Sequence, residues 1–197
     1  MKILAIGANG VIGQAVVNDL QRDNEVIAVG HSHGDYLVDI ESTESIRALY
    51  NNVGKVDAII SMVGNGQMGS LEDMPESGYR TVLDNKVMGQ VNLVRIGLDY
   101  LNKGGSITLT SGQASNRPML GTGAIAMGVA AVNAFVTSSA LELKEDKRIN
   151  AVSPRMVKET MELWGIDSSS GIPATDVAEH YRDSIESQKN GEVLDAI

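Results

Sequence analysis

The chain has 197 residues, 21 glycines, no cysteine and a formal net charge of −9 at pH 7, a length that fits one domain burying roughly two thirds of its unfolded surface. The negative charge argues against nucleic acid and anionic membranes as partners, because both attract a basic surface. Without cysteine there is no disulfide, thiolate nucleophile or sulfur-based zinc site, and the three histidines are too scattered for a metal site.

Short apolar strands alternate with helical segments along the whole chain. We predict strands over 2–6, 25–29, 36–38, 56–63, 106–110, 148–152 and 192–196. Helices are expected over 11–21, 43–53, 79–101, 124–143 and 174–188. Because no repeat, linker or low-complexity tract interrupts this alternation, we predict one α/β domain over residues 1–197. Its expected fold is a doubly wound parallel sheet of about seven strands, the Rossmann fold.

The first residues do not read as a targeting segment. The apolar run that follows Lys2 is interrupted at Gly7 and Gly10, which makes it too short for the core of a signal peptide. No later stretch approaches the length of a membrane span. We therefore expect a cytoplasmic protein.

A glycine-rich turn joins the first strand to the first helix, in the sequence ILAIGANGVIG. Gly7 permits a tight turn, Gly10 lets a pyrophosphate approach the backbone, and Gly13 allows the helix to pack on the strand. Free amides at the helix start can hold phosphates without a basic side chain. An incidental glycine-rich turn is the alternative. We predict a nicotinamide dinucleotide site formed by Gly7, Asn9, Gly10, Val11, Ile12 and Gly13.

The end of the second strand bears on the choice between NAD and NADP. An acidic residue there holds the ribose 2′-hydroxyl of NAD, whereas a phosphate-binding residue accommodates NADP. The segment VGHSH has no acid, and His31 and Ser32 can hydrogen-bond a phosphate. This favours NADP, with NAD possible. The alternative is that the histidines simply occupy an exposed turn.

Taken together, these segments resemble the short-chain dehydrogenase/reductase family nearly from end to end. GANGVIG looks like the family's cofactor loop, ITLTSG like the strand that ends in its serine, and ALEL, RINAVSP and GEVL like its later segments. The resemblance implies that Asp39 and Ile40 contact the adenine. It also implies that Met62, Val63 and Gly64 stand at the family's Asn-Ala-Gly segment beside the cofactor.

The catalytic positions depart from the family's pattern of Asn, Ser, Tyr and Lys. Ser111 matches the serine, but the resemblance places Ile125 at the tyrosine and Val129 at the lysine. Lys86 stands at the asparagine, with Asn85 one residue away. Neither Ile nor Val can donate a proton to the alkoxide that hydride transfer produces. Lys86 could take that role with Ser111 orienting the substrate; a surface or structural lysine is the simpler interpretation of Lys86. For Ser111 the alternative is a hydroxyl that caps the strand end.

Two functions follow from this combination. The first is an NAD(P)-dependent oxidoreductase that acts on a small carbonyl or alcohol with an altered proton relay. The second is a catalytically inactive NAD(P)-binding sensor or interaction protein. The resemblance also implies a homodimer or homotetramer that associates through the helices expected over 79–101 and 124–143. No metal site and no nucleic-acid or membrane partner is expected.

Overall fold

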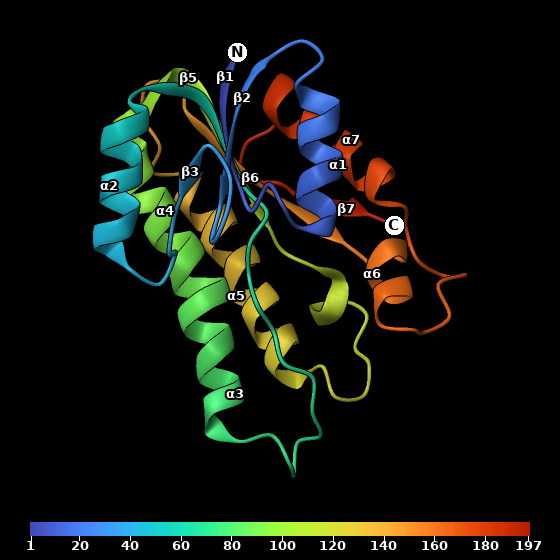
Figure 1. Cartoon of the computed structure of the whole chain (residues 1–197). Coiled ribbons are helices and arrows are strands. Elements are labelled where there is room, and N and C mark those ends of the chain that lie inside the picture. The colour runs from blue at the N-terminus through green and yellow to red at the C-terminus, as the bar shows by residue number, and fades with distance from the viewer.

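The computed structural model describes residues 1–197 and contains one seven-stranded sheet in which all strands run parallel (Figure 1). The strands are β1 (Lys2–Ile6), β2 (Glu25–Gly30), β3 (Tyr36–Leu37), β4 (Val56–Ser61), β5 (Leu101–Thr110), β6 (Arg148–Pro154) and β7 (Val193–Ala196). Their order across the sheet is β3-β2-β1-β4-β5-β6-β7, so the winding reverses between β1 and β4. The predicted doubly wound Rossmann fold is confirmed.

Helices cover both faces of the sheet (Figure 1). They are α1 (Val11–Leu20), α2 (Thr43–Val53), α3 (Glu76–Thr81), the π-helix η1 (Val82–Gly89), α4 (Gln90–Gly97), the short 3₁₀ helices η2 (Leu98–Tyr100) and η3 (Gln113–Ser115), α5 (Gly123–Ser139), α6 (Lys158–Leu163) and α7 (Ala174–Glu186). Helices α2, α4 and α5 pack on one face, and α1 and α7 pack on the other. The helices α3 and α5 extend beyond the carboxyl ends of the strands.

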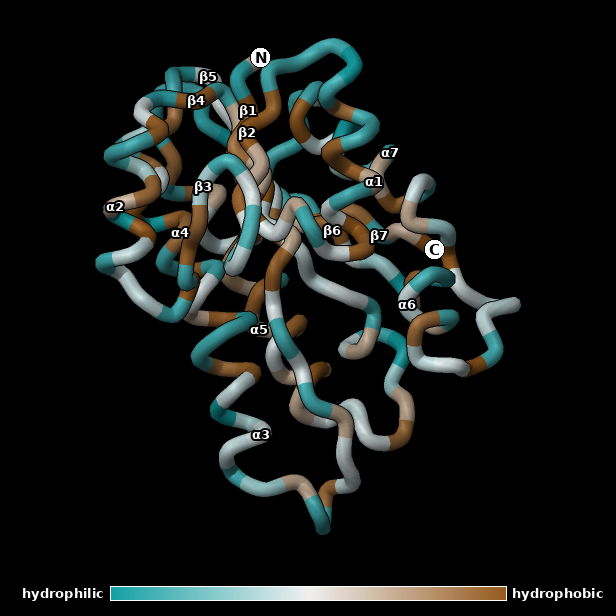
Figure 2. Tube along the Cα trace, in the orientation of Figure 1, coloured by the Kyte–Doolittle hydropathy of each residue, from teal (hydrophilic) through white to brown (hydrophobic).

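Alternate side chains of each central strand enter opposite cores. In β1, Leu4 and Ile6 pack with α2 and α4, whereas Ile3 packs with α1 and α7. All three side chains have no exposed surface. This explains the continuous apolar runs of β1 and β4, since a parallel strand with helices on both faces buries both sets of side chains. Figure 2 shows hydrophobic segments in the strands at the centre of the trace and on the helices around them.

Several element bounds differ from the sequence-based expectation. The strand expected over 106–110 begins at Leu101, because Leu101 pairs with Val56 before the register shifts past Gly104. The helix expected over 79–101 runs instead through α3, η1, α4 and η2, from residue 76 to residue 100. The helix expected over 124–143 ends at Ser139, where Asn190 donates to the carbonyl of Ala140. The short helix α6 has no counterpart in the prediction.

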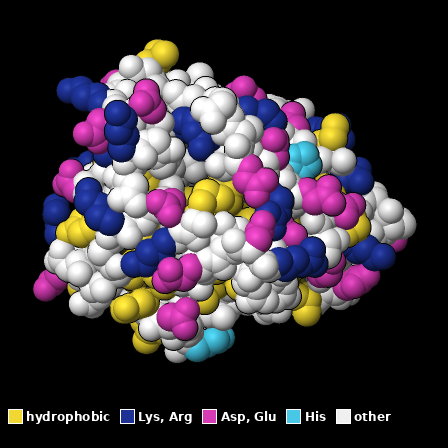
Figure 3. Space-filling model, turned by 90° about the horizontal axis from the view of Figure 1, so that it is seen from above, with side chains coloured by type: hydrophobic (Ala, Val, Ile, Leu, Met, Phe, Trp, Pro, Cys, Tyr) yellow, Lys and Arg dark blue, Asp and Glu magenta, His cyan; other side chains and the backbone are white.

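The face at the amino ends of the strands carries a mixed surface. Figure 3 shows Lys and Arg side chains interspersed with Asp and Glu over this face, with small apolar areas between them. None of the helices combines the length and the apolarity that crossing a membrane requires.

Candidate functional site

The glycine turn adopts a conformation that only glycine accommodates. Gly7 has φ +86°, and a Cβ at this position would lie 2.5 Å from the carbonyl oxygen of Met62. A Cβ at Gly13 would lie 2.0 Å from the carbonyl oxygen of Gly7, so α1 can approach the turn only through a glycine. Gly10 is the N-cap of α1, and no side chain caps the helix. The first amides of α1 are therefore free to bind an anion.

A cavity of about 510 Å³ opens in front of this turn, at the carboxyl ends of β1, β2 and β4. It lies where the winding of the sheet reverses, which is the usual ligand position in this class of fold. Ten predicted cofactor residues line it: Gly7, Asn9, Gly10, His31, Ser32, Asp39, Ile40, Met62, Val63 and Gly64. Val11, Ile12 and Gly13 begin α1 beside it but do not line it.

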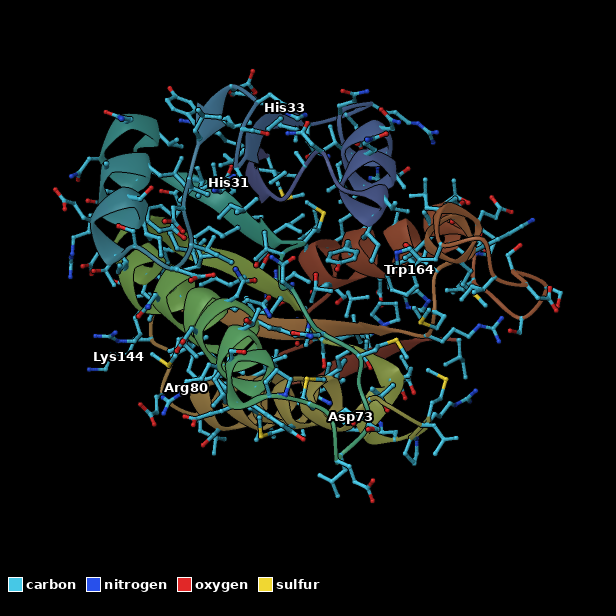
Figure 4. The ribbon with its side chains drawn as sticks, turned by 60° about the horizontal axis from the view of Figure 1, so that its bottom comes forward. His31, His33, Asp73, Arg80, Lys144 and Trp164 are labelled. Atoms are coloured by element: carbon cyan, nitrogen blue, oxygen red, sulfur yellow. The ribbon has the colours of Figure 1, made fainter.

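The loop after β2 folds back over the glycine turn. Asn9 Nδ2 donates to the carbonyl oxygen of His33 at 2.5 Å, which ties this loop to the turn. Ser32 Oγ and His33 Nδ1 are hydrogen-bonded at 2.9 Å. His31 and Ser32 are both exposed, and Figure 4 shows His31 and His33 on the same side of the carboxyl edge, away from Trp164. Exposed polar side chains are thus held beside the cavity, where a phosphate could reach them.

Asn85 joins two loops that border the cavity, a role that the sequence did not indicate. Its Nδ2 donates to Glu41 Oε1 at 2.8 Å, and its Oδ1 accepts from the amide of Asn65 at 2.8 Å. All three residues line the cavity, together with Gly30, His33, Val38 and Ile6, which the prediction also omitted. The one available signal was the position of Asn85 beside the family's asparagine.

Lys86 is buried and directed inward. Its side chain is 6% exposed, and its Nζ donates to the carbonyl oxygens of Thr110 and Ser111, each at 3.3 Å. Burial lowers the pKa of Lys86 from its ordinary value of 10.5 to about 8. Lys86 is therefore not a surface lysine, because η1 directs it to the end of β5. The other alternative, a structural lysine, agrees with its bonds to two backbone carbonyls.

Ser111 lies at the end of β5, against α5. Its hydroxyl donates to the carbonyl oxygen of Val129 at 3.2 Å, and its side chain is 4% exposed. Helix α5 contains neither tyrosine nor lysine. Ile125 instead packs against Gly66, where a Cβ would lie 2.8 Å from Ile125 Cγ1. Lys86 and Ser111 are thus the polar groups that the fold brings together next to the predicted cofactor site.

Side chains capable of binding a metal do not gather at this edge of the sheet. No group of three or more His, Cys, Asp or Glu side chains is placed to hold a metal ion. The polar groups that the site offers are the free amides of α1, the side chains of the cavity lining such as His31, Ser32 and Asp39, and the buried Lys86 and Ser111.

This chain is similar in sequence and fold to known proteins. The family model described as enoyl-(acyl carrier protein) reductase matches residues 6–193. The crystal structure of the protein lin1944 from Listeria innocua is similar with 38% identity and a TM-score of 0.96, covering 100% of both chains. A small-chain dehydrogenase solved in complex with NADPH is 26% identical with a TM-score of 0.88, covering 99% of this chain and 95% of that one.

A curated relative matches over a shorter segment. The peroxisomal 2,4-dienoyl-CoA reductase of Arabidopsis thaliana is 27% identical over 133 residues, which is 61% of this chain and 45% of that protein. The chain therefore spans less than half of the length of that relative. Since the family model covers nearly every element from β1 to β7, the chain belongs to the short-chain dehydrogenase/reductase family.

Proposed function

We propose that residues 1–197 form one NAD(P)-binding domain that catalyses NADPH-dependent reduction of a small carbonyl compound, or the reverse oxidation of an alcohol. The observation that carries this proposal is the uncapped, glycine-lined start of α1 at the head of a 510 Å³ cavity, with a buried lysine and serine just beyond it. Membership of an oxidoreductase family supports the same reading.

Different residues of the site are proposed to hold the parts of a dinucleotide. The amides of Val11, Ile12 and Gly13 have no partner in the first turn of α1 and would hold the pyrophosphate. The Gly10 amide donates to the carbonyl oxygen of Gly7 at 3.1 Å, so Gly10 would contribute by leaving the backbone open to the phosphates. Asp39 and Ile40 would hold the adenine, and Met62, Val63 and Gly64 would lie beside the nicotinamide ribose.

We propose NADPH as the preferred form, with NADH as the weaker ligand. His31 and Ser32 supply hydrogen-bonding groups for the 2′-phosphate, and no carboxylate occupies the tip of β2. The NADPH complex of the small-chain dehydrogenase supports this preference.

The reacting end relies on Lys86 and Ser111. NADPH, when bound, supplies the hydride. The Lys86 ammonium lies behind Gly64 and holds a proton for the oxygen of the reduced carbonyl, as general acid. Ser111 exchanges its hydrogen bond to Val129 for one to the substrate oxygen, which orients the carbonyl. A lysine from η1 thereby takes the position of proton donor that α5 does not supply.

The oligomeric state and the location complete the proposal. The helices η1 and α5 pack together, and both expose large apolar side chains, namely Leu83, Met88 and Met127. Together with the resemblance to a family that associates through these helices, these side chains support a homodimer or homotetramer. We propose a cytoplasmic location, which the absence of cysteine supports.

The test combines cofactor binding with turnover. NADPH and NADH are titrated by calorimetry, and NADPH oxidation is followed at its absorbance band with 9,10-phenanthrenequinone as the carbonyl probe. We expect tighter binding of NADPH and a rate that falls by about 10²–10⁴-fold in Lys86→Met, with NADPH affinity retained. Lys103→Met, which removes an exposed lysine, serves as control and keeps the rate.

The possible outcomes separate the two functions. Binding without turnover of the probe supports the inactive cofactor-binding protein. No binding of either nucleotide by the folded protein contradicts both functions.

A further inference from the structure

Gln90 is a fully buried amide whose hydrogen-bonding groups are all used. It is the first residue of α4 and has no exposed surface. Its Nε2 donates to the carbonyl oxygens of Lys86 at 3.1 Å and Thr110 at 3.0 Å. Its Oε1 accepts from the hydroxyl of Ser61 at 3.1 Å and from the amide of Thr110 at 3.0 Å. A buried amide is costly unless it is partnered, and this one has two donors and two acceptor positions satisfied.

These bonds stand where the backbone pairing of two central strands ends. Ser61 and Leu109 are the last paired residues of β4 and β5. One residue later, the amide of Thr110 donates to Gln90 instead of to β4. The Thr110 hydroxyl donates to the carbonyl oxygen of Ser61 at 2.6 Å, so a side chain of β5 still bonds the end of β4 at this point. Gln90 thus completes the hydrogen bonding of β5 at the point where the strands separate to form the site.

The same amide holds Lys86 through two routes. Gln90 binds the backbone carbonyl of Lys86 directly, four residues before it in the helix. It also binds the carbonyl oxygen of Thr110, which is one of the two acceptors of Lys86 Nζ. Consequently the Gln90 side chain fixes both the backbone of Lys86 and the carbonyl of Thr110, which accepts a hydrogen bond from the Lys86 ammonium.

We propose that Gln90 is a positioning residue that sets the location of the Lys86 ammonium by fixing both the helix and the end of β5. The inference rests on the proposed function in one respect: only there does the position of Lys86 matter for catalysis. A glutamine that only filled space would be replaceable by methionine, which has a similar length and shape but cannot form these hydrogen bonds.

The experiment uses two variants that separate packing from hydrogen bonding. Gln90→Met keeps the volume and removes all four bonds. Gln90→Glu keeps the acceptors for Ser61 and Thr110 but replaces the two N–H donors and adds a negative charge. Asn92→Asp is the matched control, because Asn92 is a buried amide on the same helix whose partner is Arg95 and not the end of β5.

The first readout is hydrogen exchange of the Thr110 amide. We expect exchange to be faster by about tenfold in Gln90→Met, because a hydrogen bond of ordinary strength is lost. It should stay slow in Gln90→Glu and in Asn92→Asp, where the acceptor remains. Unchanged exchange in Gln90→Met overturns the proposal.

The second readout is NMR titration of Lys86 in protein labelled with ¹³C-lysine, with the signal assigned by its loss in Lys86→Met. The groups in contact with Lys86 are uncharged: Gly64, Gly128 and the carbonyls of Thr110 and Ser111. A carboxylate at position 90 therefore brings a new opposite charge, and we expect the midpoint to rise by about one pH unit or more. A Lys86 midpoint in Gln90→Glu equal to that of the wild type overturns the proposal. The control Asn92→Asp should leave the midpoint unchanged.

The third readout is the rate with NADPH and 9,10-phenanthrenequinone. We expect Gln90→Met to lower kcat by about tenfold or more while the Kd of NADPH changes by less than about threefold, since the glycine turn is untouched. Loss of NADPH affinity without loss of kcat overturns the proposal. If the wild type itself does not turn over, the proposed function fails in that assay, whereas exchange and titration still decide the role of Gln90.

Discussion

The side chain of Lys86 lies directly against the backbone of Gly64. A Cβ at Gly64 would lie 2.8 Å from Lys86 Cγ and 3.2 Å from Lys86 Nζ, and Gly64 has φ +130°. Gly64 lines the cavity on its other side. One glycine therefore separates the proposed cofactor from the proposed proton donor, and no larger residue leaves room for both.

Replacing Gly64 by alanine should displace Lys86. We expect Gly64→Ala to lose about 1–3 kcal/mol of unfolding free energy from backbone strain, and to lose turnover as well. Gly104→Ala is the control, because Gly104 also has a positive φ, +72°, but a Cβ there meets nothing within 4 Å. Urea denaturation measures the stability and probe reduction measures the rate. Similar rates in the two variants would contradict the role of this contact.

Burial of Lys86 should make stability depend on pH. The pKa of Lys86 is about 8 in the folded protein, below its ordinary value of 10.5. Between these values the unfolded chain binds the proton and the folded one does not, so stability rises with pH across this window. We expect Lys86→Met to be more stable than the wild type at pH 7 by about 3 kcal/mol, and by much less near pH 10.5. Urea denaturation at both pH values tests this, and an advantage independent of pH would refute it.

The proton held by Lys86 should also appear in the kinetics. Reduction needs the ammonium form, which is lost as the pH rises through the pKa of about 8. We therefore expect kcat/KM for reduction of the quinone probe to fall above about pH 8, because this parameter reports the free enzyme. A profile that stays level from pH 7 to about pH 10 would assign the proton to another group.

The loop after β2 should determine the choice of nucleotide. Ser32 is exposed beside His31 at the rim of the cavity. In Ser32→Asp, the new carboxylate repels the 2′-phosphate of NADPH and can accept a hydrogen bond from the 2′-hydroxyl of NADH. We expect NADPH affinity to fall by about tenfold or more while NADH affinity holds or improves, as measured by calorimetry. Ser77→Asp, on the exposed start of α3, should leave both affinities unchanged.

The apolar side chains on η1 and α5 should mediate self-association. Met127 is 40% exposed on α5, close in sequence to the exposed Ala130. A double variant, Met127→Arg with Ala130→Arg, should yield monomers in light scattering because it places two buried cations in the interface. Leu141→Arg is the control, since Leu141 is 88% exposed just beyond the end of α5. A wild type that is itself monomeric would contradict the proposed assembly.

The sequence predicted best the elements whose signals lie close together along the chain. The strand over 2–6 and the helix start at Val11 match the structure, because an apolar run, three glycines and an amphipathic stripe follow one another within one segment. The cavity then collects ten of the predicted cofactor residues, because parallel strands end at a common edge.

The features that sequence missed depend on contacts between distant residues. Lys86 is buried where the π-helix η1 meets the end of β5, which Gln90 also binds, and periodicity in the sequence reveals neither the π-helix nor this contact. The early start of β5 depends on Asn102 donating to Asp57 on the neighbouring strand. Asn85, on η1, finds its partners Glu41 and Asn65 only once two loops from distant parts of the sequence meet this helix.

The π-helical turn places two consecutive residues, Asn85 and Lys86, in the interior. Asn85 reaches the loops around the cavity, and Lys86 reaches the end of β5. The residue that braces the loops around the cavity and the proposed proton donor thus occupy adjacent positions of one helix. Any shift in the pitch of that helix would disturb both tasks together, whereas a substitution of either side chain would disturb only one.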